Sequence, residues 1–367
     1  MAACSGGGTT SSSADSSEVS AQALEVAERA VEGKVMSTGA NGEEAASADV
    51  ADLTDDEIQQ IKDAGLTAAL VFHYDGNDWY NAQVAGIEAE AEKLGIEIIS
   101  ITGADFKPDK QVTNLETVLA QDPDIILSIP TDATATADEY KKVAESGTTL
   151  VFMDQPANGL VAGEDYVSVV SADNYGNGVA SAHILAESIG GEGQIAAIYH
   201  DADFFVTEQR YEGFKKTIEE DYPNIEIVAA KGDDGTVDNA QQDAAAIIQQ
   251  NPNLKGFWAP WDVPAEGVMA AARESGRTDL MISTIDLGNS MAVAMAQNQL
   301  IVGTSAQRPY DQGVTELAIA AGSRVLGKEY PSYVALQALP VTSTNLADAW
   351  QTIYHADLPD DVADLMK

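Results

Sequence analysis

Short apolar runs alternate with longer amphipathic segments from residue 68 onward, and this alternation restricts the possible folds more than any other feature of the chain. Residues recurring three and four positions apart, such as Val84, Ile87, Ala91 and Leu94, predict helices with one apolar face. Near-continuous apolar runs between such helices predict parallel strands that are covered on both faces. The first series of predicted strands covers residues 69–72, 96–101, 125–129 and 150–153.

A second series of the same kind follows Val170. Its helices include 206–220 and 237–250, and its strands are predicted at 195–199, 225–229, 256–259, 281–285 and 301–305. Two consecutive series predict an α/β protein with two Rossmann-like lobes, and the return of the chain to the first lobe predicts several crossings between them.

The charge of the chain excludes several classes of partner. Its 367 residues include 59 acidic and 19 basic side chains, a formal net charge of −40. Such a surface repels nucleic acid and is not attracted to anionic lipid. Self-repulsion of this size is tolerated where salt screens it, so a saline habitat and an ordinary acidic secreted protein both remain open.

Enzymatic and metal-binding motifs are missing from the sequence. One cysteine and four widely spaced histidines, without HExxH spacing, argue against a structural metal. No GxSxG, no GxxxxGK[ST] and no GxGxxG after the first strand occurs. We therefore predict a protein that is not an enzyme, with no catalytic residues and no cofactor. The acidic segment 1–64 also argues against a DNA-binding repressor.

The start of the chain predicts an anchor and a tether. Small residues precede Cys4 as they precede the lipidated cysteine of a bacterial lipobox, although a disordered tail that happens to carry a cysteine is the alternative. Residues 1–18 are predicted to be disordered and 19–32 to form a short helix. Thr54 followed by Glu57 predicts a capping box at the start of a second helix, which ends at Ala64.

A turn at the carboxyl end of the first strand offers the first candidate ligand contacts. It supplies Asn77 as a hydrogen-bonding amide and Trp79 and Tyr80 as flat apolar faces, where open α/β sheets bind ligands. This combination suits a sugar, whose ring is apolar on its faces and polar at its edge. The alternative is a surface turn in which two aromatics cover the end of the helix.

Residues 70–95 resemble, position by position, the first strand, loop and helix of periplasmic sugar-binding proteins of the ribose-binding type. The resemblance extends over residues 66–342 and implies the type I periplasmic-binding fold with a three-segment hinge. The hinge segments would be 171–174, 306–309 and 338–341, and the tail 342–367 extends beyond the matched part.

The resemblance and the strand ends together point to further ligand contacts. Asp154 and Asp286 each follow a predicted strand, and a carboxylate can accept two sugar hydroxyls. Arg210 and Gln307 match a family arginine and a hinge glutamine that touch the sugar. Taken singly, these residues could equally be a helix cap, a surface ion pair or a loop residue.

Two departures from the family pattern put ribose itself in doubt. Gln155 stands where many relatives have an arginine, and Trp261 stands where ribose binders have an asparagine. Gln155 and Trp261 are nevertheless predicted to contact the ligand. A different pentose, a tetrose or a small polyol is as well supported as ribose. Residues 199–205 also end a strand and could reach the cleft, although packing of their two phenylalanines in the core or in a lid is the favoured alternative.

These features predict an extracytoplasmic, lipid-anchored monomer that captures a small neutral sugar or polyol and delivers it to an ABC permease. The alternative is a receptor module that reports the sugar to a sensor kinase or chemoreceptor. The predicted divisions are a tether and extension at 1–64, an N-terminal lobe at 65–172 and 307–338, and a C-terminal lobe with tail at 173–306 and 339–367.

Overall fold

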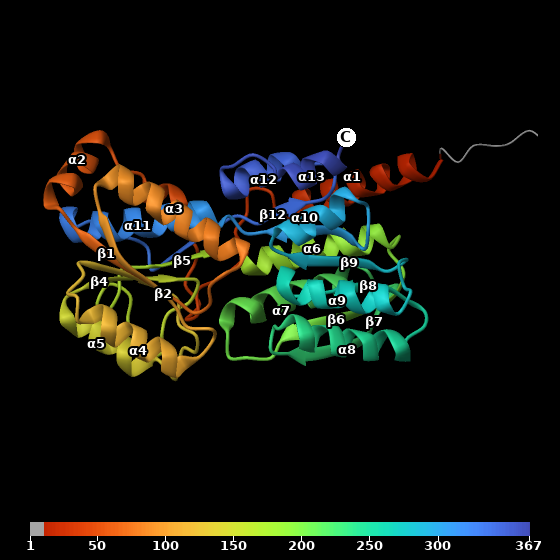
Figure 1. Ribbon diagram of the computed structural model, residues 1–367, viewed down its shortest axis with the longest axis horizontal. Helices are drawn as coiled ribbons and strands as arrows, with labels where there is room; N and C mark the ends of the chain where they lie inside the picture. Colours follow the sequence, from red (N-terminus) through yellow and green to blue (C-terminus); the bar gives the residue numbers. More distant parts are fainter. Residues whose placement is uncertain (1–10) are drawn as a thin grey trace, which may run out of the picture.

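The computed structural model describes residues 11–367, which form two lobes, each built on a six-stranded sheet (Figure 1). The strands of the first sheet, in chain order, are β1 (Thr67–Phe72), β2 (Glu97–Gly103), β3 (Ile125–Ser128), β4 (Thr149–Met153), β5 (Val169–Ala172) and β11 (Tyr333–Leu336). Their spatial order is β11-β5-β4-β3-β1-β2, and every neighbouring pair is parallel. This sheet forms the N-terminal lobe.

The second sheet forms the C-terminal lobe and repeats this arrangement. Its strands are β6 (Gly193–His200), β7 (Ile225–Asp233), β8 (Leu254–Trp258), β9 (Met281–Ile285), β10 (Ile301–Ala306) and β12 (Leu339–Val341). The spatial order is β12-β10-β9-β8-β6-β7, in which only the short edge strand β12 runs antiparallel to its neighbour. The predicted α/β fold with two Rossmann-like lobes is confirmed.

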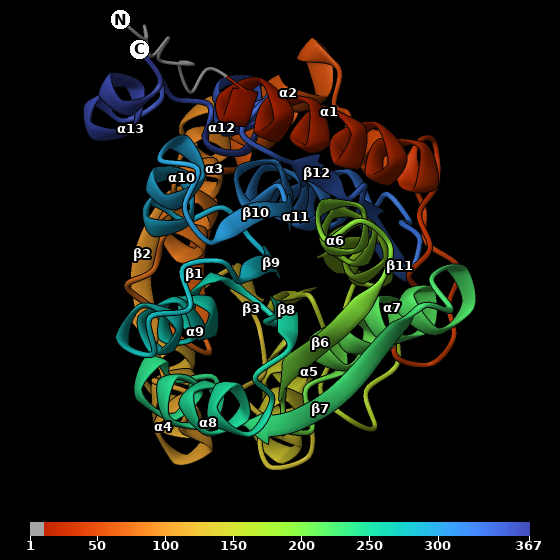
Figure 2. The ribbon, with the colours of Figure 1, turned by 90° about the vertical axis from the view of Figure 1, so that its right-hand side faces the viewer.

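Helices cover both faces of each sheet. Figure 2 shows α8 and α9 on one side of the second sheet and α6 and α7 on the other. The helices are α1 (Ser11–Val31), α2 (Asp55–Ala64), α3 (Asp78–Leu94), α4 (Pro108–Leu119), α5 (Ala137–Ser146), α6 (Asn174–Ser188), α7 (Phe205–Asp221), α8 (Val237–Gln250), α9 (Asp262–Glu274), α10 (Asn289–Ala296), α11 (Pro309–Leu326), α12 (Leu346–Tyr354), α13 (Asp360–Leu365) and the 3-10 helix η1 (Ala48–Ala51).

The apolar runs that predicted the strands bury alternate side chains on opposite faces of the sheet. In β1, Leu70 and Phe72 pack in one core of the N-terminal lobe, whereas Ala69 and Val71 pack in the core on the other face. Successive side chains of a strand point in opposite directions, so only a strand covered on both faces needs a continuous apolar run.

From β1 onward the chain passes between the lobes three times. It leaves the first sheet from β5 into α6, returns from β10 into α11, and leaves again from β11 into β12. These crossings lie at residues 172–174, 306–309 and 336–339 and form the hinge of the type I fold. The domain boundaries predicted at 172/173, 306/307 and 338/339 fall at these crossings and stay a proposal.

The segment before β1 differs in part from expectation. The capping box is confirmed, because the Thr54 hydroxyl accepts from the Glu57 N–H while the Glu57 side chain accepts from the Thr54 N–H. The expectation of disorder up to residue 18 is wrong for residues 11–18, since α1 already begins at Ser11. Ala27 and Val31 bury the apolar face of α1 against α6, a partner that local composition does not reveal.

Candidate ligand-binding site

A cavity of about 290 Å³ lies between the two lobes. The chain segments around it leave the carboxyl ends of strands in both sheets, which is where open α/β sheets bind ligands. The lining residues are His73, Tyr74, Asn77, Trp79, Phe106, Asp154, His200, Phe204, Val206, Thr207, Arg210, Asp234, Gly235, Thr236, Val237, Trp261, Val263, Asp286 and Gln307.

Asp154 and Asp286 occupy equivalent places in the two lobes. Asp154 directly follows β4 and Asp286 directly follows β9, and both have left-handed backbone angles, with φ of 58° and 68°. Aspartate tolerates this conformation better than most residues. Each backbone N–H is fixed by the next strand, that of Asp154 to the Val170 carbonyl (2.8 Å) and that of Asp286 to the Ser305 carbonyl (3.1 Å).

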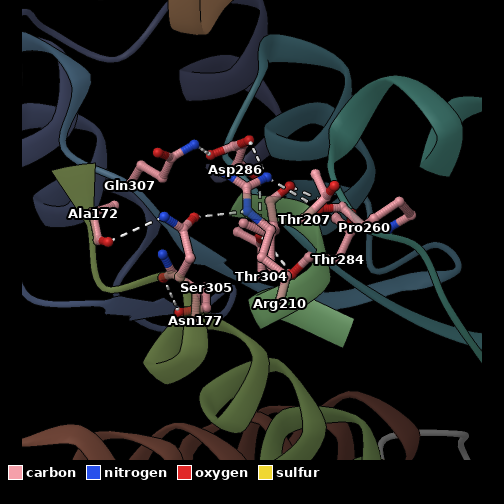
Figure 3. A network of polar contacts seen from close by, with 12 residues as sticks. Ala172, Asn177, Thr207, Arg210, Pro260, Thr284, Asp286, Thr304, Ser305 and Gln307 are labelled. Carbon is pink, nitrogen blue, oxygen red and sulfur yellow. Dashed lines mark hydrogen bonds and ion pairs between the residues drawn. The ribbon is translucent and has the colours of Figure 1, made fainter. Parts of the chain in front are cut away.

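A buried polar network holds the second of these carboxylates (Figure 3). Gln307 donates from its Nε2 atom to Asp286 Oδ1 (2.9 Å), and the Arg210 guanidinium lies 3.5 Å from Asp286 Oδ2. Arg210 also donates to the Pro260 carbonyl (3.2 Å). Arg210, Asp286 and Gln307 are each at least nine-tenths buried, so water screens their charges weakly.

Asn174, at the first crossing, connects this network to the other lobe. Its Oδ1 atom accepts from Arg210 Nε (2.9 Å), and its Nδ2 atom donates to the Ser171 hydroxyl (3.0 Å). Ser171 in turn donates to Asp154 Oδ1 (2.8 Å). The charged groups of the two lobes are therefore joined through side chains of the hinge.

Aromatic rings from both lobes close the cavity. His73 and Phe204, from opposite lobes, stack with their centroids 5.6 Å apart, and Phe106 meets Phe204 edge-to-face at 6.4 Å. Trp261 packs edge-to-face on His200 at 5.2 Å. Its indole lies directly over Gly235, where φ is +81° and any side chain would overlap the ring, so only glycine permits this wall.

Burial sets the charges of the cavity. It lowers the pKa of His73 to about 3 and that of His200 to about 4, so both imidazoles are neutral at neutral pH. It also raises the pKa of Asp154 to about 6, an increase limited by the Ser171 hydrogen bond and the positive charge of Arg210. The cavity thus combines one cation with several carboxyl groups and neutral rings.

Three polar atoms of the cavity-lining side chains are buried and lack a partner within residues 11–367. They are His73 Nδ1, Trp79 Nε1 and Gln307 Oε1. Buried polar groups in proteins are almost always hydrogen-bonded, and those that are not usually mark a functional site. We infer that a polar ligand between the lobes supplies these partners.

Direct hydrogen bonds between the lobes flank the cavity. The Phe205 N–H donates to Gln155 Oε1 (3.0 Å). The Asn289 N–H, in the first turn of α10, donates to Asp78 Oδ2 (2.7 Å). The structure therefore describes a closed arrangement of the lobes.

Seven of the nine predicted ligand contacts come together around this cavity: Asn77, Trp79, Asp154, Arg210, Trp261, Asp286 and Gln307. Tyr80 and Gln155 do not line it. Tyr80 lies one position further along α3 and packs edge-to-face on Phe72, with centroids 4.8 Å apart. The ligand contacts themselves stay a prediction for all nine residues.

Several cavity residues were not among the nine predicted contacts. His73 and Tyr74 belong to the same turn as Asn77, and His200 and Phe204 belong to the 199–205 segment, for which the sequence left a place in the cleft open. Their position after strands was the available signal. Phe106 and Thr236 carried no comparable signal, because they lie in loops whose direction depends on the packing of both lobes.

The described residues contain neither a metal centre nor a membrane span that can be recognised from the structure. Between residues 11 and 367, no group of three or more histidine, cysteine, aspartate or glutamate side chains is placed to hold a metal ion. Among the helices of the same range, none combines the length and the apolar character that crossing a membrane requires. Cys4, the predicted lipidation site, lies outside the described residues.

A family model described as a periplasmic binding protein domain matches residues 68–329. This chain belongs to the periplasmic binding protein family. The resemblance to its ribose-binding type is confirmed by curated relatives. The D-allose-binding periplasmic protein of Escherichia coli is 27% identical over 279 residues, covering 73% of this chain and 88% of the relative. The D-apiose import binding protein of Actinobacillus succinogenes is 25% identical over 250 residues, covering 68% and 79%.

Solved structures of the family have the same architecture. An ABC transporter solute-binding protein from Agrobacterium vitis, bound to α-D-tagatopyranose, superposes with a TM-score of 0.72 at 26% identity, covering 79% of this chain and 99% of its own. The arabinose-binding protein of Geobacillus stearothermophilus gives 0.66 at 25% identity, covering 77% and 98%.

Proposed function

We propose that this protein captures a small neutral sugar or polyol outside the cell, between its two closing lobes, and delivers it to an ABC importer. The observation that carries this proposal is the cavity between the lobes, which is lined by aromatic rings and by buried polar atoms that have no partner within residues 11–367. Sugars fit such a site because they are apolar on the ring faces and polar at the edge.

Each lobe would hold one side of the ring. Asp154 from the N-terminal lobe and Asp286 from the C-terminal lobe would accept hydroxyls, while Arg210 and Gln307 would donate to them. Hydrogen bonds to charged groups contribute about 1.5–3 kcal/mol each, and a micromolar affinity needs about −8 kcal/mol, so five or six contacts suffice after ordering costs. Trp79 and Trp261 would cover the ring faces.

The charge of the cavity favours a neutral ligand. Asp154, Asp286 and Asp234 face it against the single cation Arg210, so an anionic sugar would be repelled. Neither histidine adds a positive charge near neutral pH. Binding would shift an existing balance between open and closed lobes, since only the closed form contacts the ligand from both sides.

The cellular setting is part of the proposal. Curated relatives are named as import binding proteins, which supports delivery to a permease over reporting to a sensor kinase. They are also named for binding and not for catalysis, which supports a function without chemistry. We further propose that the protein is a monomer, anchored outside the cytoplasm through a lipid on Cys4.

A thermal-shift panel tests the ligand class. We expect D-allose, D-arabinose, D-apiose, D-ribose, D-tagatose or glycerol to raise the melting temperature, because a ligand at 100 times its dissociation constant adds about 2.7 kcal/mol of stability. Calorimetry would then give the affinity. The proposal is wrong if none of these has an effect while a peptide, a purine or an organic acid stabilises the protein.

Binding should weaken in acid because of Asp154. Its pKa of about 6 exceeds the ordinary value, so the carboxylate that accepts sugar hydroxyls becomes protonated as the pH falls through about 6. We expect the affinity measured by calorimetry to fall by up to about tenfold for each pH unit below that value.

The contribution of Asp154 to stability should have the opposite sense in the ligand-free protein. Between about pH 4 and about pH 6 the folded protein holds a proton on Asp154 that the unfolded chain has released, so this contribution to the free energy of unfolding should fall as the pH rises. His73 and His200 contribute in the other direction over the same range, so the contribution of Asp154 is measured as the difference between the wild type and Asp154→Asn, which should also lose the pH dependence of the affinity. A wild-type affinity profile that is flat across this range would contradict the role of Asp154.

A further inference from the structure

The segment before β1 contacts both lobes and passes beside the hinge crossings. Its helix α1 buries Ala27 and Val31 against α6 of the C-terminal lobe. Further along, Ala51 and Ile61 join the core of the N-terminal lobe. Figure 1 shows α1 beside the C-terminal lobe and α2 at the far end of the other lobe. The matched family domain begins only at residue 68, so this segment lies outside it.

The connection between these two anchors, residues 33–47, is hydrogen-bonded to two of the three crossings. At the first crossing, the N–H groups of Met36 and Ser37 and the Ser37 hydroxyl donate to the Asp173 carboxylate, at 2.9, 2.8 and 2.9 Å. At the third, Gln337 donates from its side chain to the Lys34 carbonyl (3.2 Å).

The same connection then joins the edge of the first sheet. The Ala46 N–H donates to the Tyr333 carbonyl (3.0 Å), and the Ala335 N–H donates to the Ala46 carbonyl (3.1 Å), so the chain pairs with β11. Residues 33–47 are therefore fixed at one end to α6 and at the other to β11. These two elements belong to different lobes.

Asp173 connects this segment to the binding site. Its carboxylate also accepts from the Gly176 N–H (2.9 Å), which caps α6, and the Ser37 hydroxyl accepts from the Tyr175 N–H (2.9 Å). The next residue, Asn174, is the one that joins Arg210 to Ser171 and Asp154. Ser37 thus holds the turn of chain from which Asn174 reaches the site.

We propose that residues 33–47 are a brace that limits how far the lobes open, with Ser37 and Asp173 as positioning residues of the ligand site. Asp173 is fully buried, and the donors to its carboxylate within residues 11–367 come from this brace and from the start of α6. Opening the lobes would rotate the backbone at the first crossing, residues 172–174, and would move the Asp173 carboxylate away from Ser37. A buried carboxylate without its donors is strongly unfavourable, so wide opening is opposed.

Weakening the brace should change the ligand-free ensemble first. Two variants do so mildly: Ser37→Ala removes one hydroxyl, and Asp173→Asn removes the charge while keeping a side chain that caps helices well. We expect the distribution of distances between the lobes to extend to larger values in both variants. A smaller fraction of closed protein should also raise the apparent dissociation constant for the sugar about three- to tenfold. This second expectation rests on the proposed function.

The distances are measured on the full chain by pulsed electron paramagnetic resonance between two spin labels. The native cysteine is removed by Cys4→Ser. The labels are attached to Thr117→Cys on α4 and to Asp238→Cys on α8. Both positions are exposed, and they lie on different lobes. Ser47→Ala is the matched control, since it removes a hydroxyl of the brace that accepts only from the nearby Asp49 N–H among the described residues and contacts neither crossing. A melting temperature for each variant separates loss of folding from opening.

The outcomes separate this inference from the proposed function. Longer distances in Ser37→Ala and Asp173→Asn but not in Ser47→Ala would support the brace, even if no sugar in the panel bound. Unchanged distances in both variants, with the protein folded, would overturn it, even if D-allose or D-arabinose bound normally. Equal lengthening in all three variants would also overturn it, because the effect would then not depend on the crossing.

Discussion

Replacing Asp286 by alanine should abolish sugar binding while the fold is retained. The carboxylate accepts from Gln307, lies beside Arg210, and would accept hydroxyls of the ligand. Each hydrogen bond to a charged group contributes about 1.5–3 kcal/mol, so the loss of two should weaken binding at least about 100-fold. Isothermal titration calorimetry with the sugar identified in the panel gives the result.

The fold should survive this substitution with some loss of stability. Arg210 keeps its bonds to Asn174 and to the Pro260 carbonyl, although its charge is no longer balanced by Asp286. Alanine also tolerates a φ of 68° less well than aspartate, by an amount of order 1 kcal/mol. Circular dichroism and a melting curve measure these effects separately from binding.

The control for Asp286→Ala lies at the opposite end of the same strand. Asp279, just before β9, is an exposed partner of Arg277, so Asp279→Ala should leave the affinity unchanged. Asp286→Asn should give an intermediate affinity, because the amide keeps one acceptor but loses the charge. If Asp286→Ala binds as tightly as the wild type, the C-terminal half of the proposed site is wrong.

Replacing Trp79 by alanine should weaken binding about 10- to 100-fold. The indole lines the cavity, and its Nε1 atom is buried without a partner within the described chain, so it would provide both a flat face and a donor. Stacking contributes about 0.5–1.5 kcal/mol beyond burial, and a neutral hydrogen bond contributes about 1 kcal/mol. Calorimetry measures the loss.

Trp79 also belongs to the core of the N-terminal lobe, so truncation to alanine will lower stability as well, by about 3–5 kcal/mol. Trp79→Phe keeps the flat face and loses only the N–H, and it should weaken binding about five- to tenfold. Its matched control is Trp350→Phe, which changes a buried tryptophan in the core of the other lobe, away from the cavity. Equal affinities for Trp79→Phe, Trp350→Phe and wild type would exclude the indole N–H as a ligand donor.

Sequence reasoning located seven of the residues around the cavity because the ends of strands are visible in the local sequence. Asp154 and Asp286 follow apolar runs directly, and the carboxyl ends of parallel strands share one edge of a sheet. It did not reveal that both residues have left-handed backbone angles, which aim the two carboxylates into one space. That conformation depends on the neighbouring strand that fixes each N–H.

Gln155 illustrates what position alone cannot decide. Its place after a strand and the family pattern predicted a ligand contact, but its side chain accepts from the Phe205 N–H across the cleft and donates to the Pro130 carbonyl. We interpret it as a contact that holds the lobes together when they are closed. Its partner lies 50 residues away in the chain, so no local pattern could have indicated the pairing.

The sequence by itself determined most of the strands and helices of the two lobes and the edge of each sheet at which ligands bind, because apolar periodicity, helix caps and strand ends are local properties. Tertiary structure alone decided which side chains of the two lobes face one another, and it alone showed that α1 and residues 33–47 join both lobes. Those features depend on contacts between residues far apart in the chain, separated by 50 positions for Phe205 with Gln155 and by 136 for Ser37 with Asp173. Such contacts are specified by packing of the whole chain.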